Sequence, residues 1–160
     1  MTKRHNIFIS HYERDDKHVQ SLKQRLKDSG KDIRNFSVDS TKHKDGRRPS
    51  KAVIQRLLSI RIKACNTFIC LIGSDTHTRP WVDFEIKKAH EEGKNIIGIY
   101  KYGDKNKVDI PERLVKYGSS IIGWNSLDKL VDIIEGNTSV FENPDGSPST
   151  GYHKIQRVSC

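Results

Sequence analysis

Short apolar segments alternate with longer amphipathic segments along most of this 160-residue chain. The short segments predict strands, because they end at polar or turn-forming residues and are too short for helices. They cover residues 5–10, 33–38, 67–72, 95–100 and 119–124. Segment 67–72 is the clearest of them, since its apolar character throughout is typical of a central strand covered on both faces.

The amphipathic segments predict one helix after each strand, because their apolar residues recur at helical spacing. Asp15 is a candidate N-cap of the first helix, and Ser50 opens the second. Pro80 suits the first turn of the third helix, and Pro111 starts a short fourth one. We expect Ser126 to cap the last helix.

Five successive strand–helix units favour a single α/β domain: a flavodoxin-like, three-layer sandwich around a five-stranded parallel sheet. The predicted strand order is 2-1-3-4-5. We place this domain at residues 1–136. Residues 137–160 are rich in Asn, Pro, Gly and Ser, which predicts an irregular extension that packs on the domain or is partly flexible. Within it, residues 152–158 are a candidate for an added strand or a partner contact.

Composition agrees with a cytosolic protein that has one apolar core. Hydrophobic residues make up 34% and charged residues 31% of the chain, and no apolar run approaches the ~20 residues that span a bilayer. The basic start precedes too short an apolar segment for a signal peptide. Three cysteines without a CxxC spacing argue against disulfides or a zinc site, so Cys65 and Cys70 are expected to be buried. The histidines are scattered and lack the spacing of a metal-binding motif, so no metal site is predicted.

A net charge of +9 and a pI near 9.5 favour anionic partners. Basic residues are densest between residues 42 and 63, where Asp45 alone opposes eight of them. This stretch is either a solvated helix face and loop, or a surface that attracts a dinucleotide pyrophosphate or nucleic acid. Nucleic acid is the less favoured partner, because the stretch has no aromatic platform on which bases could stack.

The predicted topology fixes where a ligand would bind. In such sheets, ligands sit beyond the carboxyl ends of the strands where the order reverses, here between the first and third strands. Several polar or small residues follow strands at that edge. They are Ser10, His11 and Tyr12 after the first strand, Asp39 after the second, and Gly73 and Ser74 after the third.

The third helix begins at the same edge and brings Trp81 and Glu85 near it. Four residues apart, they share a helix face. We expect Glu85 to be partly desolvated beside an aromatic wall, which raises the pKa of a carboxyl group and strengthens its interaction with a developing positive charge. The alternative is a surface glutamate on an ordinary amphipathic helix.

At these residues the chain resembles a known family. Residues 7–12 (Ile-Phe-Ile-Ser-His-Tyr) resemble the first signature of TIR domains, and residues 81–85 (Trp-Val-Asp-Phe-Glu) resemble the WxxxE motif of TIR NAD hydrolases. The Ser-His-Tyr opening, with residues 71–74 and 78–82, is similar more specifically to the TIR-like proteins of bacterial Thoeris anti-phage systems. The resemblance covers about residues 6–134 and implies a TIR-like form of the predicted sandwich.

The resemblance implies an enzyme that needs no cofactor and takes NAD as its substrate. Glu85 would bind the ribose hydroxyls of the nicotinamide half and stabilise an oxocarbenium-like transition state. Since nicotinamide leaves as a neutral group, one carboxylate suffices where ordinary glycosidases need two. Water or a nucleophile on the adenosine half then captures the ribosyl cation. The Thoeris resemblance favours internal capture, giving a cyclic ADP-ribose isomer that signals to a separate effector protein.

The resemblance also nominates substrate-binding residues. They are Phe8, Ser10, His11, Tyr12, Asp39, Ser74 and Trp81. His11 could equally cap backbone groups in its loop. The loop at residues 39–49 matches the position of the loop used in TIR assembly, which predicts a homo-oligomer, and its Arg47 and Arg48 could contact a neighbouring subunit or substrate phosphates. No membrane partner is expected. The chain departs from many TIR domains in lacking a cysteine after Trp81.

Other functions remain open at this point. A non-catalytic TIR adaptor would keep Glu85 as a surface residue and use its loops for assembly. A nucleoside-transferring enzyme would also direct a glutamate at a glycosidic bond. A response-regulator receiver needs an aspartate after the third strand, where this chain has Gly73 and Ser74. A flavodoxin needs a phosphate loop rich in Ser and Thr, unlike residues 10–14.

Overall fold

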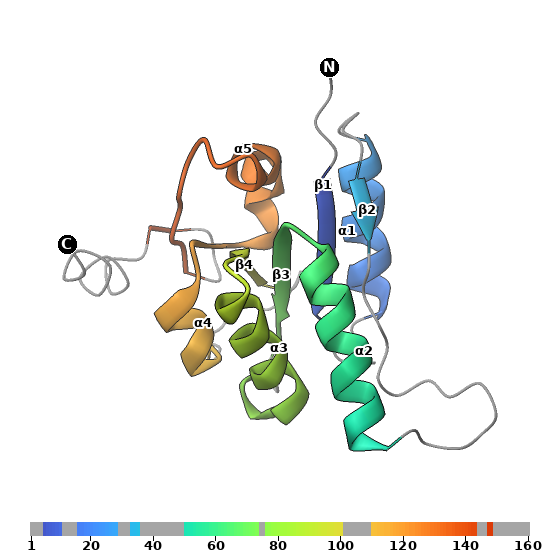
Figure 1. Cartoon of the computed structure of the whole chain (residues 1–160). Helices are drawn as coiled ribbons and strands as arrows, with labels where there is room; N and C mark the ends of the chain where they lie inside the picture. The colour runs from blue at the N-terminus through green and yellow to red at the C-terminus, as the bar shows by residue number, and fades with distance from the viewer. Residues whose placement is uncertain are drawn as a thin grey trace.

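The computed structural model describes residues 5–10, 16–28, 33–35, 50–73, 76–100, 110–143 and 147–148. The strands are β1 (His5–Ser10), β2 (Ile33–Asn35), β3 (Thr67–Ile72), β4 (Asn95–Tyr100) and β5 (Ser120–Ile122). The α-helices are α1 (Asp16–Asp28), α2 (Lys51–Ala64), α3 (Pro80–Glu91), α4 (Glu112–Tyr117) and α5 (Leu130–Ile134). Two 3-10 helices are η2 (Thr76–Thr78) and η3 (Trp124–Lys129). Figure 1 shows their arrangement.

The five strands form one parallel sheet in the order β2-β1-β3-β4-β5. This confirms the predicted fold class, strand number and order. β3 is central, with Phe68 opposite Phe8 on one side and Ile96 on the other. All six of its residues are buried, as expected for a strand covered on both faces. Of the predicted second strand, residues 36–38 lie outside the described residues.

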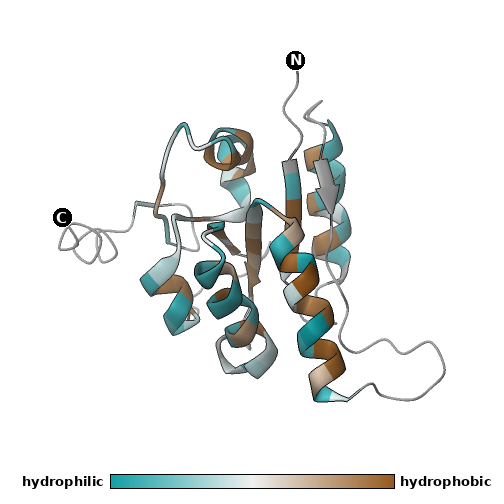
Figure 2. Cartoon of the chain, viewed as in Figure 1, coloured by the Kyte–Doolittle hydropathy of each residue, from teal (hydrophilic) through white to brown (hydrophobic). Residues whose placement is uncertain are grey.

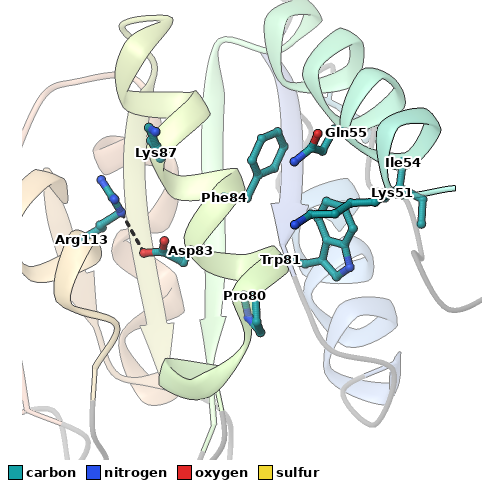
Figure 3. A pocket seen from close by; sticks show the side chains of 9 residues that line it. All are labelled: Lys51, Ile54, Gln55, Pro80, Trp81, Asp83, Phe84, Lys87 and Arg113. Carbon is teal, nitrogen blue, oxygen red and sulfur yellow. Dashed lines mark hydrogen bonds and ion pairs between the residues drawn. The ribbon is translucent and has the colours of Figure 1, made fainter.

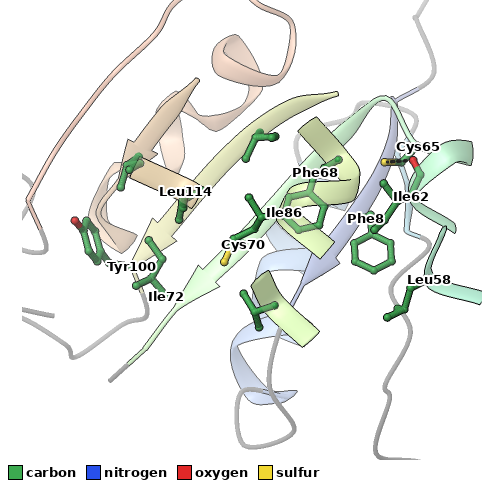
Figure 4. Packing of buried hydrophobic residues seen from close by; sticks show 14 of the residues in the cluster. Phe8, Leu58, Ile62, Cys65, Phe68, Cys70, Ile72, Ile86, Tyr100 and Leu114 are labelled. Carbon is green, nitrogen blue, oxygen red and sulfur yellow. Dashed lines mark hydrogen bonds between the residues drawn. The ribbon is translucent and has the colours of Figure 1, made fainter. Parts of the chain in front are cut away.

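Two apolar cores, one on each face of the sheet, make the three layers. Side chains of α2, α3 and α4 pack on one face together with Phe68, Cys70 and Ile72 (Figure 4). Those of α1, η3 and α5 pack on the other face, where Ile69 and Leu71 point. The alternation along β3 follows from the two-residue period of a strand. Figure 2 shows the apolar strand β3 behind the helices, and it also shows that the outer side of α2 is partly apolar, since Val53, Leu57 and Ile60 are exposed.

The cysteine prediction is confirmed for the two described cysteines, since Cys65 and Cys70 are buried free thiols. Burial raises the pKa of the Cys65 thiol to about 11, so this side chain is packed as an apolar residue and is not ionised at neutral pH. No described helix is long and apolar enough to cross a membrane.

Helix α2 begins as predicted. The Ser50 hydroxyl accepts a hydrogen bond from the Val53 N–H at 3.3 Å, which satisfies one of the free donors of the first turn. The apolar positions of this helix divide between two environments: Ile54, Leu58 and Ile62 are buried. Val53 and Leu57 of the same helix are exposed.

The predicted cap at Ser126 is wrong. Ser126 lies inside η3, where its N–H donates to the Gly123 carbonyl, and α5 begins only at Leu130. The buried side chains of Trp124, Leu127 and Leu130 are spaced three residues apart. A spacing of three suits the 3-10 helix, whose side chains align every third residue. The chain therefore starts to coil directly after β5, two residues before the expected cap.

The described part of the C-terminal extension lies along the edge of the sheet beside β5. The Ile121 N–H donates to the Val140 carbonyl at 2.8 Å, and the Glu142 N–H donates to the Ile121 carbonyl at 2.7 Å. Phe141 is buried in the core that α2, α3 and α4 cover. These contacts occupy backbone groups that an edge strand would otherwise expose. Residues 152–158 lie outside the described residues, so their predicted role stays a prediction, as does the domain boundary at residue 136.

Candidate functional site

The sheet reverses its order between β1 and β3. The chain leaves β1 for α1 on one face of the sheet, and leaves β3 for α3 on the other. Because the two connections diverge, the carboxyl ends of these strands form the switch point of the sheet, which is where the ligand-binding crevice lies in open α/β sheets. Ser10 is the last residue of β1, and its side chain is buried.

Glu85 projects from the buried face of α3 toward this crevice. It follows Val82 by about one helical turn. The other buried residues of α3 are apolar, yet Glu85 lies among them with a side chain that is only 6% exposed. The Ser10 hydroxyl donates a hydrogen bond of 3.1 Å to Glu85 Oε1. The structure thus joins two predicted site residues that are 75 positions apart in the chain.

Burial raises the pKa of the Glu85 carboxyl to about 8, and the hydrogen bond from Ser10 partly opposes this rise. The predicted burial and direction of the shift are therefore confirmed. Within the described ranges, no lysine, arginine or histidine forms an ion pair with Glu85. A carboxyl group without a cationic partner is costly to bury in its charged form.

Thr76 shapes the turn that delivers α3 to the crevice. Its Oγ1 accepts a hydrogen bond of 2.8 Å from the Gly73 N–H and lies 3.4 Å from the Leu71 carbonyl, to which it donates. Thr76 is 5% exposed, so these bonds satisfy a buried hydroxyl. The sequence analysis missed this residue. Its signal was a threonine three positions after Gly73, the spacing at which a side-chain hydroxyl can close a turn.

Phe8 and Trp81 each contact another aromatic ring. Phe8 is fully buried and stacks on Phe68, with the ring centres 5.5 Å apart. Trp81 is half-buried, and its ring meets that of Phe84 edge-on at 5.8 Å. The described contacts pair Trp81 with Phe84, and Glu85 with Ser10. The substrate-binding roles of Phe8 and Trp81 stay predictions.

Four further predicted site residues lie outside the described residues: His11, Tyr12, Asp39 and Ser74. The same holds for the loop at residues 39–49, with Arg47 and Arg48. Among the described residues, no group of three or more His, Cys, Asp or Glu side chains could hold a metal ion.

A groove of about 710 Å³ lies between α2 and α3, on the face of the sheet that α2, α3 and α4 cover (Figure 3). Nine described residues line it: Lys51, Ile54, Gln55, Pro80, Trp81, Asp83, Phe84, Lys87 and Arg113. Glu85 is not among them. One face of α3 thus borders this groove, while another carries Glu85 toward Ser10.

Comparison with known proteins gives the family. The profile of the family described as "Thoeris protein ThsB, TIR-like domain" matches residues 8–106, which is more than half of the chain and includes both Ser10 and Glu85. The chain belongs to the Thoeris ThsB TIR-like family. The ThsB match begins within β1 and extends past β4, so it spans the crevice and the start of α3.

One curated relative of this ThsB-family chain is named "Putative cyclic ADP-D-ribose synthase ThsB1", from Bacillus cereus (strain MSX-D12). It is 35% identical over 69 residues, which are 43% of this chain and 36% of the relative. The match therefore spans about a third of the relative's length.

Two solved structures share the fold with the ThsB-family chain. One is a conserved protein from Enterococcus faecalis V583, with a TM-score of 0.55, 12% identity and coverage of 98% of this chain and 88% of that one. The other is a 2-deoxyribosyltransferase from Bacillus psychrosaccharolyticus, with a TM-score of 0.56, 17% identity and coverage of 90% and 98%. At these identities the likeness shows the fold alone.

Proposed function

We propose that this chain cleaves the bond between nicotinamide and ribose in NAD, with Glu85 as the catalytic carboxylate. Its product would be a cyclic ADP-ribose isomer that signals to a separate effector protein in anti-phage defence. Membership of the Thoeris ThsB family and the name of the curated relative support this reaction class.

The burial of Glu85 is the observation that carries the proposal. A carboxyl group that is 6% exposed and has only the Ser10 hydroxyl as its described hydrogen-bond partner lowers the stability of the fold whenever it ionises. Residues whose pKa is strongly shifted by burial cluster at functional sites. A glutamate that served only the surface of an adaptor would have no reason to occupy this position.

The chemistry suits a single buried carboxylate. When the glycosidic bond breaks, nicotinamide takes the bonding electron pair and leaves neutral, while positive charge develops at the ribose anomeric carbon. An anionic oxygen in a poorly solvated crevice stabilises that charge more strongly than one in water. Ser10 would hold one oxygen of Glu85 in place through its hydroxyl.

The protonation state of Glu85 would respond to the substrate. With a pKa of about 8, Glu85 is mainly the neutral acid at pH 7 before substrate binds. The nicotinamide ring of NAD is cationic, and a positive charge nearby favours the carboxylate. Binding of NAD would therefore expel the proton and create the anion beside the bond that is to be broken.

The fate of the ribosyl cation would distinguish two products. Attack by water gives linear ADP-ribose and releases the water proton. Attack by a nucleophile on the adenosine half gives a cyclic isomer that is lighter by one water, and that nucleophile loses its proton. Exclusion of water from the crevice would favour the cyclic product.

The test is to incubate the purified protein with NAD and to resolve nicotinamide and nucleotide products by chromatography and mass spectrometry. We compare the wild type with Glu85→Gln and with Glu91→Gln, which alters an exposed carboxyl group on the same helix. We expect Glu85→Gln to lose about 100-fold or more of the nicotinamide release, and Glu91→Gln to keep it.

A folded Glu85→Gln protein with wild-type turnover would overturn the assignment. A folded wild type that releases no nicotinamide, alone or with an extract of phage-infected cells, would favour the non-catalytic adaptor role. Assembly into a homo-oligomer stays a prediction, which the mass of the active species in solution would test.

A further inference from the structure

The connection from β3 to α3 decides where Glu85 lies relative to Ser10. Ser10 lies opposite Cys70 in the register of β1 and β3, so its backbone is fixed to the central strand of the sheet. Glu85 belongs to α3, the next α-helix along the chain after β3. The 3.1 Å hydrogen bond between the Ser10 and Glu85 side chains therefore requires that α3 starts at a defined position beyond the end of β3.

Apolar packing and helix capping leave that position to be fixed by another contact. Val82, Ile86 and Ala89 of α3 are buried in the core. The hydrophobic effect that holds them there has no direction of its own, whereas a hydrogen bond depends on both distance and angle. Arg79 occupies the N-cap position of α3 without a side-chain capping bond, so the start of this helix lacks the bond that usually fixes it.

Thr76 bonds to both sides of this connection. Its hydroxyl holds the end of β3, because Oγ1 accepts a 2.8 Å bond from the Gly73 N–H and donates to the Leu71 carbonyl at 3.4 Å. Its backbone carbonyl accepts a 3.2 Å bond from the Arg79 N–H. The Arg79 carbonyl in turn accepts a 3.2 Å bond from the Asp83 N–H, in the first turn of α3. A continuous run of hydrogen bonds thus links the end of β3 to α3 through Thr76.

Burial makes the Thr76 hydroxyl hard to replace. Thr76 is 5% exposed, so little water reaches its side chain. Gly73 is buried as well. Loss of the hydroxyl would leave the Gly73 N–H without its acceptor, and a buried donor without an acceptor favours movement of the backbone that carries it.

We propose that Thr76 is a positioning residue: its hydroxyl fixes the start of α3 and thereby holds Glu85 within hydrogen-bond distance of Ser10. This inference rests on the proposed NAD cleavage by Glu85. A catalytic group must be held close to its productive geometry, because a displacement of about 1 Å can cost about 100-fold in rate. Since Thr76 acts through Glu85, its hydroxyl should affect turnover and leave the affinity for substrate nearly unchanged.

The test compares Thr76→Val, which keeps the branched shape and removes the hydroxyl, with Thr76→Ser, which keeps the hydroxyl. Thr76→Val should lower kcat for nicotinamide release from NAD at least about tenfold, with KM within about twofold of the wild type. Thr76→Ser should restore most of the turnover. Thr76→Ala is a second variant without the hydroxyl, for use if Thr76→Val does not fold.

Ser120→Ala is the control for a loss of stability alone. Ser120 is buried on β5, and its hydroxyl accepts a 3.0 Å bond from the Val140 N–H. The exchange therefore also removes a buried hydroxyl that satisfies a backbone donor. Because β3 and β4 separate β5 from β1 in the sheet, Ser120→Ala should lower the free energy of unfolding and leave kcat unchanged.

A second measurement does not depend on NAD. A ¹³C NMR titration of the Glu85 carboxyl follows the surroundings of this group directly. Burial is the larger of the two causes that set its pKa of about 8. If Thr76→Val loosens the start of α3, water reaches Glu85 and its pKa falls toward the ordinary value of 4.5. Thr76→Ser should keep the wild-type pKa. If the wild type released no nicotinamide, the proposed function would fail, and this titration would still decide whether Thr76 positions Glu85.

A folded Thr76→Val or Thr76→Ala protein that keeps the wild-type pKa of Glu85 would overturn the proposal. Equal losses of kcat in Thr76→Val and Ser120→Ala would do the same, because Thr76 would then contribute to stability alone. A loss in Thr76→Ser as large as that in Thr76→Val would also contradict it, since the hydroxyl would not be the group that acts.

Discussion

At the scale of single residues, one hydroxyl limits how far burial raises the pKa of Glu85. The Ser10 hydrogen bond lowers the pKa that burial raises. We therefore expect Ser10→Ala to move the pKa of Glu85 further upward, which ¹³C NMR titration of the glutamate side-chain carboxyl would measure. Ser10→Thr keeps the hydroxyl and serves as the control. An unchanged or lower pKa in Ser10→Ala would contradict the role of this bond.

The buried carboxyl also predicts how stability depends on pH. Its pKa in the folded chain, about 8, lies above the ordinary value of 4.5. Between these values the folded state keeps a proton that the unfolded chain releases, so the free energy of unfolding falls as the pH rises from about 4.5 to 8. Glutamine does not ionise. Glu85→Gln should therefore be more stable than the wild type at pH 9, by on the order of 5 kcal/mol.

Urea unfolding at pH 5 and pH 9 would measure this effect. The advantage of Glu85→Gln should be much smaller at pH 5, because the folded chain keeps its proton there and the unfolded chain has only begun to lose its own. Glu91→Gln, which changes an exposed carboxyl group on the same helix, is the matched control. An equal difference between Glu85→Gln and the wild type at both pH values would mean that Glu85 ionises normally in the folded protein.

The sequence predicted Glu85 but not its surroundings. Helical spacing grouped it with Trp81, but the hydrogen bond to its carboxyl group comes from Ser10 on β1, which spacing along α3 does not reveal. Thr76 escaped notice, because a buried hydroxyl that bonds the backbone leaves no periodic pattern. Spacing along one helix reports which residues share its surface, whereas the partner on each side depends on how distant segments pack.

At the scale of elements, the start of α2 depends on one side chain. Ser50 accepts a bond from the Val53 N–H, and the first turn contains no acidic residue. Ser50→Ala should lower the free energy of unfolding by about 1 kcal/mol. Ser50→Asp should retain it or add to it, because aspartate both caps and complements the helix dipole. Urea unfolding at low salt would check this, and equal losses in both variants would contradict capping.

Most elements were predictable, because strand and helix periods differ clearly along this chain. The central strand at 67–72, the helix after Pro80 and the order of the strands all agree with the structure. The failed prediction at Ser126 has a physical cause. Trp124 and Leu127 are both buried, and the 3-10 helix that buries them already includes Ser126, so this residue cannot cap a later helix start. Tertiary packing overrides a local capping preference there.

At the scale of the whole molecule, Glu142 ties the extension to the domain. Its carboxylate is 3% exposed, accepts a 2.9 Å bond from the Gly123 N–H and pairs with Lys129 at 3.2 Å. Glu142→Ala should lower the free energy of unfolding by about 1–3 kcal/mol, because it leaves a buried donor without its acceptor. Glu142→Gln, which keeps an amide oxygen, should cost less.

Urea unfolding and hydrogen exchange would test this together. Faster exchange at the Ile121 amide, which donates to Val140, is expected in Glu142→Ala, since loosening of the extension uncovers the sheet edge. Unchanged stability and exchange in both variants would mean that the extension is held by Phe141 and its backbone bonds alone.

The pairing of β1 with β3 has a consequence for synthesis on the ribosome. Ile7 lies opposite Thr67, so the strand made first must wait for sixty more residues before its central neighbour exists. Until then the nascent chain carries Ile7, Phe8 and Ile9, all of which the finished fold buries completely or nearly so. Non-local parallel pairing of this kind forms slowly, and exposed apolar strands of incomplete chains invite aggregation. The first strand of a growing chain is therefore exposed to aggregation until the third has emerged.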